Sequence, residues 1–364
     1  MNNTSGSHNT ASGFNALGSN TTGIENTADG YGALAANTTA HFNTAIGFLA
    51  LSKNTTGSGN TASGYRALES NTTGTSNTAN GRNALHGNST GINNTASGFG
   101  ALAANTSGGN NTANGYAALT ANTTGAFNTA AGVNALSKDT TGQKNTAVGF
   151  NAMLNNTVGN SNTVLGYEAG YFLTTGANNV DIGNTGVAAD SNTIRVGTQG
   201  TQTATFIAGV AGSMVTGDAV VVSSTGKLGI VMSSARFKRD IHDMGGASTR
   251  LLKLRPVSFR YNHDPSNTLQ YGLVAEEVAK SYPELVSYGD DGKPQSVRYL
   301  ELSAMLLNEL QKQNGRLRKQ AIENQRQAEQ IKQLSAQLTQ LKGMFEHAMA
   351  APAGARGLAA AFDR

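Results

Sequence analysis

The sequence predicts a mainly β protein with an α-helical C-terminus: a β-solenoid, a small α+β domain and a terminal coiled coil. Three observations predict this class. An Asn-Thr-x-x-Gly motif recurs with a constant 17-residue period, at Asn9, Asn26, Asn43 and onward to Asn162, without insertion. Glycine makes up 45 of the 364 residues and keeps that fixed spacing, which is a signature of repeat architectures. From about Leu300 to His347, apolar residues follow alternating heptad steps, which is typical of a coiled coil.

Composition excludes several classes of function. Only 13% of the residues are charged and the formal net charge is +4, so no strong basic field for nucleic acid is present. The chain has no cysteine, which removes disulfides and thiol chemistry. It has neither an apolar run long enough for a membrane span nor the basic and apolar regions of a secretory signal. We therefore expect no nucleic-acid partner, no membrane insertion and no cofactor or metal.

Residues 1–177 contain ten repeats, and each repeat predicts one coil of a solenoid. Glycine occupies the fifth position of every repeat, where it can supply a corner with positive φ. The ninth position is Leu, from Leu17 to Leu136, and then Met153. The sixth position is aromatic in eight repeats, at Phe14, Tyr31, Phe48, Tyr65, Phe99, Tyr116, Phe150 and Tyr167. We expect two short strands and two turns per coil, with Asn and Thr ladders and an aromatic–Leu seam repeating every ~4.8 Å.

A coil this short encloses little apolar surface. One aromatic, one Leu and one or two Ala per repeat offset poorly an ordering entropy of roughly 1–2 kcal/mol per residue. We therefore expect the array to bury its Leu and aromatic stripe against copies of itself, most simply as a homotrimer. The repeats also resemble those in the heads of trimeric adhesins. Because the chain begins within a coil, we expect either an N-terminal attachment partner or a trimmed reading frame.

Asn-x-Thr/Ser sequences of the glycosylation type recur in the array. All occupy one repeat position, which favours a turn or ladder role over glycosylation. They begin at Asn20, Asn37, Asn54, Asn71, Asn88 and Asn105.

The period breaks at Asn178, and residues 178–232 predict a β-rich neck. Short runs rich in β-branched residues alternate there with glycine-containing turns. We expect strands at 180–182, 193–196, 203–208, 220–222 and 228–231, with a further one near Val215.

The junction after the neck carries Ser233 and Lys238, five residues apart. A serine hydroxyl is a poor nucleophile until a base takes its proton, and a neutral amine can act as that base. A lysine amine, with an ordinary pKa of about 10.4, needs burial or a nearby cation to be neutral near pH 7. Arg236 and Arg239 flank Lys238 in the sequence. Because burial requires a folded and assembled module, self-cleavage there would depend on correct assembly.

Five sequence blocks, in order, resemble the peptidase S74 domain, the C-terminal intramolecular chaperone of phage tail fibres and tail spikes. The resemblance covers residues 233–317. The blocks are 233–241 (S-x-x-R-F-K-x-x-I), 254–261, 271–278, 282–286, and Tyr299 with the Leu-rich helix after it. The family's domain directs trimeric folding of a β-structured stalk and often then cuts itself off.

That resemblance implies roles for particular residues. Ser233 would be the nucleophile, Lys238 the general base, and Met232–Ser233 the scissile bond. The chaperone would then occupy residues 233–299. Ser234 stands where the family often has Asp, which bears on how efficiently the bond is cut. At most, this activity is a single self-cleavage, and no motif for an external substrate is evident.

After the chaperone we expect a coiled-coil helix over 300–347 and a disordered tail over 348–364. Together these features predict a trimeric fibre protein outside the cell, on a virion tail or a bacterial surface, with a host glycan or receptor as partner. One alternative is a trimeric autotransporter-like adhesin without cleavage. The other is a polysaccharide-degrading tail spike, which would need a facing carboxylate pair. The carboxylates of the repeats occupy scattered positions, namely Glu25, Asp29, Glu69, Asp139 and Glu168.

Overall fold

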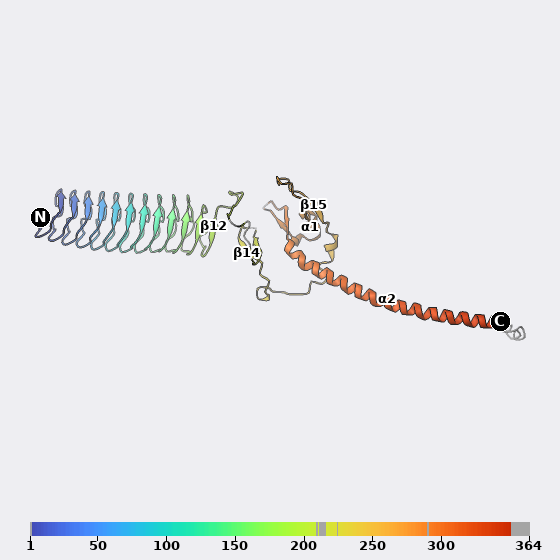
Figure 1. Cartoon of the computed structure of the whole chain (residues 1–364). Helices are drawn as coiled ribbons and strands as arrows, with labels where there is room; N and C mark the ends of the chain where they lie inside the picture. Colours follow the sequence, from blue (N-terminus) through green and yellow to red (C-terminus); the bar gives the residue numbers. More distant parts are fainter. Residues whose placement is uncertain (1, 209, 211–215, 224, 290, 351–364) are drawn as a thin grey trace. The chain divides into compact units, whose positions relative to one another are not determined.

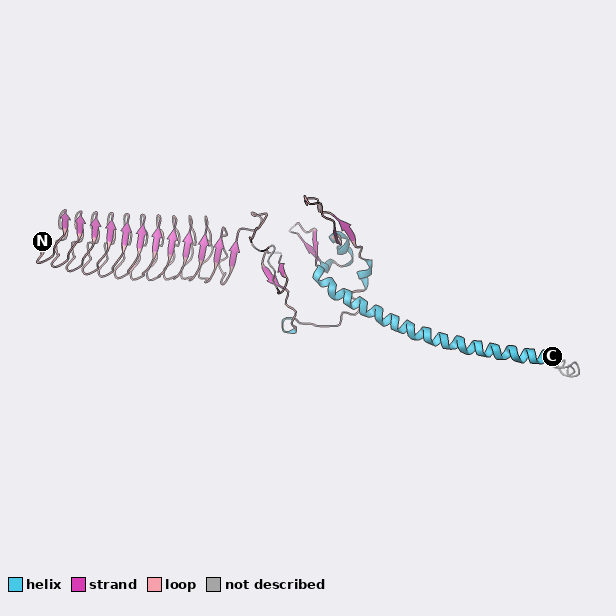
Figure 2. Cartoon of the chain, viewed as in Figure 1, coloured by secondary structure: helices cyan, strands magenta, loops and turns pink. Residues whose placement is uncertain are grey.

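The computed structural model of the chain describes residues 2–208, 210, 216–223, 225–289 and 291–350 (Figure 1). The chain divides into two compact units, Met1–Val231 and Met232–Arg364. Figure 2 shows short strands throughout the first unit and a long helix in the second. The prediction of a mainly β protein, with a β-solenoid of 17-residue repeats and a C-terminal helix, is confirmed.

The first unit begins with a solenoid, in which strands β1 to β12 form one parallel sheet in sequence order. Neighbouring strands pair exactly one repeat apart from β1 to β11, as in Thr10 with Thr27. Each coil contributes one strand of three residues rather than the two strands expected, because turns occupy the rest of the coil. The strands are β1 (Thr10–Ser12), β2 (Thr27–Asp29), β3 (Thr44–Ile46), β4 (Thr61–Ser63), β5 (Thr78–Asn80), β6 (Thr95–Ser97), β7 (Thr112–Asn114), β8 (Thr129–Ala131), β9 (Thr146–Val148), β10 (Thr163–Leu165), β11 (Val180–Ile182) and β12 (Ile194–Val196).

A glycine after each of the strands β1 to β10 forms the corner that the repeat predicted. Gly98, after β6, has φ +131°, a conformation that side chains with a Cβ rarely adopt. A Cβ at Gly98 would also lie 2.5 Å from the carbonyl oxygen of Gly115 in the next coil. The fixed glycine is therefore required both by backbone conformation and by the close approach of successive coils.

The apolar core runs along the inside of the solenoid. Each interior coil turns inward an Ala from its strand and an Ala-Leu pair from the following turn, as in Ala96, Ala101 and Leu102. The aromatic side chains point outward and are exposed. The expected aromatic–Leu seam is therefore wrong: the two residue types lie on opposite sides of the coil wall. Leu102 reaches the interior by adopting φ +51°, a left-handed conformation that costs roughly 1–2 kcal/mol.

Two ladders of asparagine side chains line the same interior. In one, the Asn26 side chain donates to Asn9 Oδ1, and the pattern recurs in later coils. In the other, Asn37 Nδ2 donates to Asn20 Oδ1 at 2.8 Å. The second ladder contains the glycosylation-type asparagines, which are buried. Their predicted role as ladder residues is confirmed.

The sheet extends beyond residue 177, where the neck was expected to begin. Strand β11 pairs with β10 at the usual spacing, and β12 pairs with β11 after a shortened coil, with Val180 opposite Ile194. At the inward positions of these two strands, Asp181 and Arg195 replace the alanine of the repeats. Arg195 binds Asp190 through two hydrogen bonds of 2.6 and 2.9 Å. The apolar core thus ends at a layer of charged side chains.

Among its described residues, the remainder of the first unit contains one antiparallel hairpin, formed by β13 (Val220–Val222) and β14 (Leu228–Ile230). Residues 203–208, expected as a strand, are irregular. A strand needs a neighbour for its backbone hydrogen bonds, and none of the described segments pairs with this one. Val215, also expected in a strand, lies outside the described residues.

The second unit is a small α+β module followed by a long helix. Its core contains Leu251, Val278, Tyr282, Leu285 and Leu302 among others. The elements are η1 (Ala235–Phe237), η2 (Thr249–Lys253), β15 (Val257–Phe259), β16 (Gln270–Gly272), α1 (Ala275–Ser281), η3 (Pro283–Leu285), β17 (Val286–Tyr288), β18 (Pro294–Val297) and α2 (Tyr299–Ala350). Strands β15 and β16 form one antiparallel hairpin, and β17 and β18 form another.

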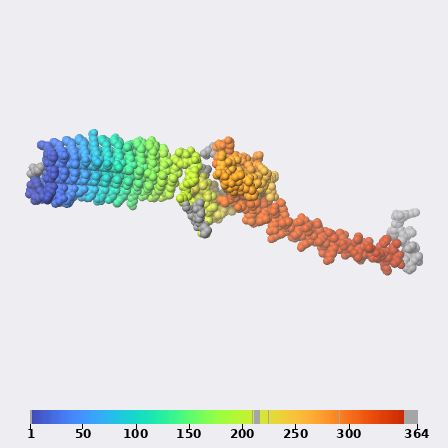
Figure 3. Space-filling view, turned by 45° about the horizontal axis from the view of Figure 1, so that its top comes forward, coloured from blue at the N-terminus to red at the C-terminus, as the bar shows by residue number. Residues whose placement is uncertain are grey.

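Helix α2 contributes Leu302, Met305 and Glu309 to the module, and almost all of its later side chains are exposed. Figure 3 shows this later part as a narrow rod, coloured red. The helix ends at Ala350, beyond the predicted bound of residue 347, and residues 351–364 of the expected tail lie outside the described residues. Within the described residues, no helix carries an apolar stretch sufficient to cross a bilayer.

Candidate self-cleavage site

A single tight turn brings Ser233 and Lys238 together. The turn is η1, in which the backbone amides of Phe237 and Lys238 donate to the carbonyls of Ser234 and Ala235 at 3.0 Å. Ser234 and Lys238, on either side of the turn, have extended backbones (ψ 141° and 147°). Extended flanks around one helical turn fold the chain back on itself. Lys238 Nζ then donates to Ser233 Oγ at 3.3 Å.

Both members of this pair are exposed in the single chain. The same is true of Met232, whose carbonyl belongs to the bond that the resemblance assigns for cleavage. Met232 is also the first residue of the second unit. The distance between Lys238 Nζ and Ser233 Oγ is slightly longer than the about 2.6–3.2 Å of direct proton transfer, as such contacts often are before a reactive complex forms.

The two arginines that flank Lys238 in sequence make contacts of their own. The Arg236 guanidinium lies over the Phe237 ring, 4.6 Å from its centroid. Arg239 faces Asp240 at 3.9 Å in an exposed ion pair, an interaction of small energy. Asp240 has φ +54°, so the chain turns sharply just after the lysine. Neither arginine has a contact with the lysine amine among the described interactions.

A buried polar cluster ties the segment after the candidate site to helix α2. Ser248 Oγ donates to Glu309 Oε1 at 2.6 Å, and Lys312 Nζ donates to the same oxygen at 2.7 Å. Asn308 Nδ2 donates to Ser248 Oγ at 2.5 Å. The hydrogen bonds from Lys312 and then from Ser248 lower the pKa of the Glu309 carboxyl below its ordinary value. Ser248 is fully buried and Glu309 nearly so, which makes the cluster a fixed joint between the module and the helix.

A second joint involves Tyr282, the largest fully buried side chain of the module. Its hydroxyl donates to the Ala247 carbonyl at 3.0 Å, and the Arg250 guanidinium lies 4.4 Å from its ring centroid. The segment that carries Tyr282 therefore holds the backbone next to Ser248. Both joints lie downstream of Ser233 and Lys238 and support the segment that follows them.

Sequence reasoning found the Ser233–Lys238 pair but missed the Ser248 cluster. The partners are 60 to 64 residues apart in the chain, so no local sequence pattern predicts the contact. The one available signal is Glu309 and Lys312, three residues apart on one face of a helix. The described residues contain no group of three or more His, Cys, Asp or Glu side chains that could hold a metal ion.

The fold and this site define a class of protein: a rod of repeated coils joined to a small α+β module with a Ser–Lys pair at its start. Residues 233–287 match the model of the Peptidase S74 family, described as the chaperone of endosialidase. The match begins at Ser233 and confirms the resemblance for the four blocks between 233 and 286, while the fifth, Tyr299 with its helix, lies outside the matched residues. No curated protein and no solved structure matches the chain. A module that matches this family, after a β-solenoid shaft, fits a protein of the tail-fibre or tail-spike type.

Proposed function

We propose that this chain is the subunit of a homotrimeric fibre, assembled by its C-terminal module, which then releases itself at Met232–Ser233. The fibre would act in attachment outside the cell, on a virion tail or a bacterial surface. A host glycan or receptor, and a partner at the N-terminal end, would complete it. The observation that carries the proposal is the 3.3 Å contact between Lys238 Nζ and Ser233 Oγ at the first residues of the matched family module.

The proposed reaction uses only this chain and water. Lys238, once neutral, accepts the hydroxyl proton of Ser233, and Oγ adds to the carbonyl carbon of Met232. The C–N bond breaks as the lysine returns the proton to the Ser233 nitrogen, which leaves an ester between Met232 and Ser233 Oγ. Water then hydrolyses the ester to the Met232 carboxylate and the free serine hydroxyl. Ser–Lys pairs of this kind are an established variant of activated serine nucleophiles.

Assembly of the trimer would bury Ser233 and Lys238, which are exposed in the single chain. Both side chains are exposed here, and a lysine amine becomes neutral near pH 7 when burial disfavours its charge. Packing of three modules around the junction would provide that burial. Cleavage would then occur only after the trimer has formed.

Helix α2 supports the trimeric arrangement. Its predicted seam is apolar except at Asn314 and Asn324, and its large side chains, including Leu310, Leu317 and Ile331, are solvent-exposed along the single chain. Leucines in heptad register are normally buried between helices, and an asparagine in such a seam fixes the register of the helices. In light scattering we expect the uncleaved chain to have the mass of three subunits. A monomeric mass would contradict the proposal.

Cleavage is tested by intact mass and N-terminal sequencing of the purified chain. We expect the wild-type protein to yield a fragment that begins at Ser233. That fragment should disappear in Ser233→Ala and Lys238→Ala, while Ser234→Ala, the neighbouring hydroxyl, should retain it. Unchanged cleavage in the first two variants would indicate an external protease. A trimer that never cleaves would favour the adhesin-like alternative.

The polysaccharide-degrading alternative receives no support from the repeats. Asp139 and Glu69, two of the carboxylates in the array, are buried in the coil wall. Glu69 is paired with Arg66 and with His86. An inverting or retaining glycosidase needs two carboxyl groups facing one substrate.

A further inference from the structure

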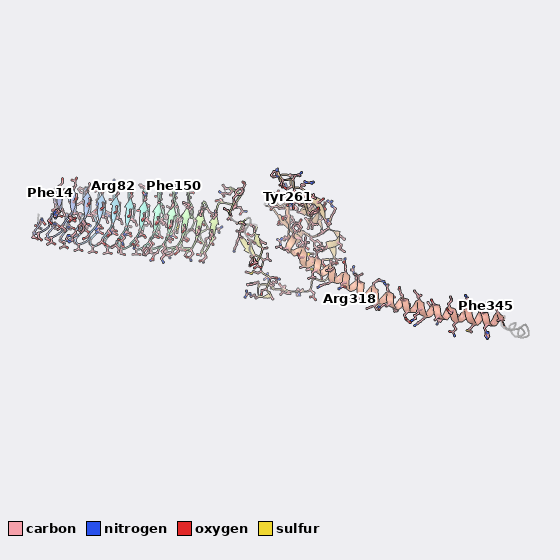
Figure 4. The ribbon with its side chains drawn as sticks, viewed as in Figure 1. Phe14, Arg82, Phe150, Tyr261, Arg318 and Phe345 are labelled. Carbon is pink, nitrogen blue, oxygen red and sulfur yellow. The ribbon has the colours of Figure 1, made fainter. Side chains whose placement is uncertain are left out.

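One continuous row of side chains lies on the outside of the solenoid, directly after the corner glycines. We call it the aromatic row. Its members occupy the sixth repeat position: Phe14, Tyr31, Phe48, Tyr65, Arg82, Phe99, Tyr116, Val133, Phe150 and Tyr167. Wherever two rings are adjacent they are stacked, with centroids 5.3 Å apart. Figure 4 labels Phe14, Arg82 and Phe150 along one side of the solenoid.

The row exposes more apolar surface than a single chain ordinarily does. Its rings are between 41% (Phe48) and 73% (Phe14) exposed. An aromatic side chain has about 150–250 Å² to bury, so half of each of eight rings amounts to about 800 Å². The largest apolar patch of a typical monomer is about 300–600 Å². About 800 Å² per partner is what a stable protein–protein interface buries.

Arg82 does not interrupt the row. Its guanidinium carbon lies 5.5 Å from the Tyr65 centroid and 5.6 Å from that of Phe99, so it occupies the place of a ring by cation–π contact. The charged groups beside this point are paired, because Glu69 binds both Arg66 and His86. Two charges belong to this face: the Arg82 guanidinium, which has ring contacts but no carboxylate among the described ion pairs, and Glu168 beside Tyr167 at the end of the row. The row is therefore apolar along most of its length, and a partner that covers it must also accommodate these two groups.

The regular spacing identifies the partner. A small ligand or an irregular surface would contact a few neighbouring rings and leave the others exposed. A second copy of this chain presents the same row at the same spacing and can keep every contact from the first coil to the tenth. We propose that the aromatic row is the face along which three shafts pack in parallel, coil against equivalent coil, around the axis of the trimer. This inference rests on the trimer proposed above and names its interface.

Single-cysteine variants of the whole chain test the proposal, since the natural sequence contains no cysteine. Val133→Cys places a thiol in the aromatic row without removing a ring, at a position 39% exposed in the single chain. Thr141→Cys is the matched control, exposed elsewhere on the same coil. In the trimer we expect a short bis-maleimide to link chains through Val133→Cys and not through Thr141→Cys. We also expect a bulky maleimide to react at least tenfold more slowly with Val133→Cys than with Thr141→Cys.

The outcomes separate this inference from the trimer itself. A trimer that cross-links through Thr141→Cys alone, or in which Val133→Cys reacts as fast as the control, overturns the inference and leaves the trimer standing. The row would then face solvent and be free for a ligand such as a glycan. A monomeric mass by light scattering overturns the trimer and the inference together.

Discussion

Replacing Asp139 by asparagine is expected to stabilise the shaft by about 4 kcal/mol at pH 8. Asp139 occupies a position that asparagine holds in neighbouring coils, and it is fully buried. Burial raises the pKa of its carboxyl to about 7, against an ordinary value of 3.8. One unit of pKa corresponds to about 1.4 kcal/mol, so a charged carboxylate at this place inside the solenoid strongly lowers the free energy of unfolding of the shaft.

The ladder geometry shows what the carboxyl lacks. Asn156 Nδ2 donates to Asp139 Oδ1 at 2.6 Å, and Asn122 Nδ2 donates to Asn105 Oδ1 at 2.8 Å. The link between them is missing: within the described structure, Asp139 Oδ2 and Asn122 Oδ1 have no hydrogen-bond partner. Two acceptor oxygens cannot bond to each other, whereas an amide or a protonated carboxyl donates to the neighbouring oxygen. Asparagine restores the bond at every pH.

The pH dependence follows from the raised pKa. Between about pH 4 and pH 7 the folded shaft retains a proton that the unfolded chain has released, so stability falls as pH rises through that range. The groups facing the carboxyl are neutral, namely the Asn122 and Asn156 amides and the Gly142 backbone N–H. Lys138 is exposed and donates to Asn155. Asp181, whose pKa is raised to about 6 mainly by burial, adds a change of the same sign over the narrower range from about pH 4 to pH 6.

Urea unfolding of the whole chain at pH 5 and pH 8 measures the effect. We expect Asp139→Asn to raise the midpoint most at pH 8 and to flatten the dependence on pH. The reverse change, Asn105→Asp, serves as control: it puts a second carboxyl in the ladder and should lower the midpoint, more at pH 8. Equal midpoints for wild type and Asp139→Asn at pH 8 would contradict the account.

Gly98→Ala is expected to disrupt the shaft, with a loss of about 4–5 kcal/mol or more. The added Cβ would meet the Gly115 carbonyl oxygen at 2.5 Å and its carbon at 2.7 Å. Those atoms belong to the backbone of the next coil, where a shift disturbs the hydrogen bonds between coils. The φ of +131° adds strain of its own, since L-residues rarely adopt it.

Gly100→Ala, in the same coil, separates the two causes. Its φ is +66°, but the nearest atom to an added Cβ is Thr120 Oγ1 at 3.9 Å. Only the left-handed conformation is then penalised, by about 1 kcal/mol. Thermal or urea unfolding of both variants gives the comparison. Similar small losses in the two would mean that successive coils do not approach as closely as described.

The sequence predicted the parts of this molecule that depend on repetition. An uninterrupted 17-residue spacing implies equivalent coils in register, and the paired strands have that register. The corner glycines and the ladder role of Asn20 and its equivalents followed from fixed positions within the repeat. At the junction, the sequence blocks that resemble the S74 domain indicated Ser233 and Lys238 as a pair, and the turn at Ala235–Phe237 brings the two side chains into contact.

Other features could not be predicted because they depend on contacts distant in sequence. The Ser248–Glu309 hydrogen bond joins residues 61 positions apart. The coil before β12 is shorter than the others, so the sequence no longer shows the 17-residue period there. Strand β12 nevertheless pairs with β11 and extends the sheet. Residues 203–208 have strand-like composition but no partner in the described structure, and composition alone cannot supply one.

By itself, the sequence determined that equivalent coils stack and where their corners lie. It also determined where the shaft ends and where a module that begins with a serine and a lysine follows. Only the tertiary structure decided which side of the coil wall each side chain occupies. Tyr116 and Leu119 are three residues apart in one turn, yet the ring is exposed and the leucine buried. The leucine points inward because its backbone is left-handed, with φ +51°. Burial of the side chain, worth about 1.5–3 kcal/mol, offsets the strain of that conformation only after the coils have stacked.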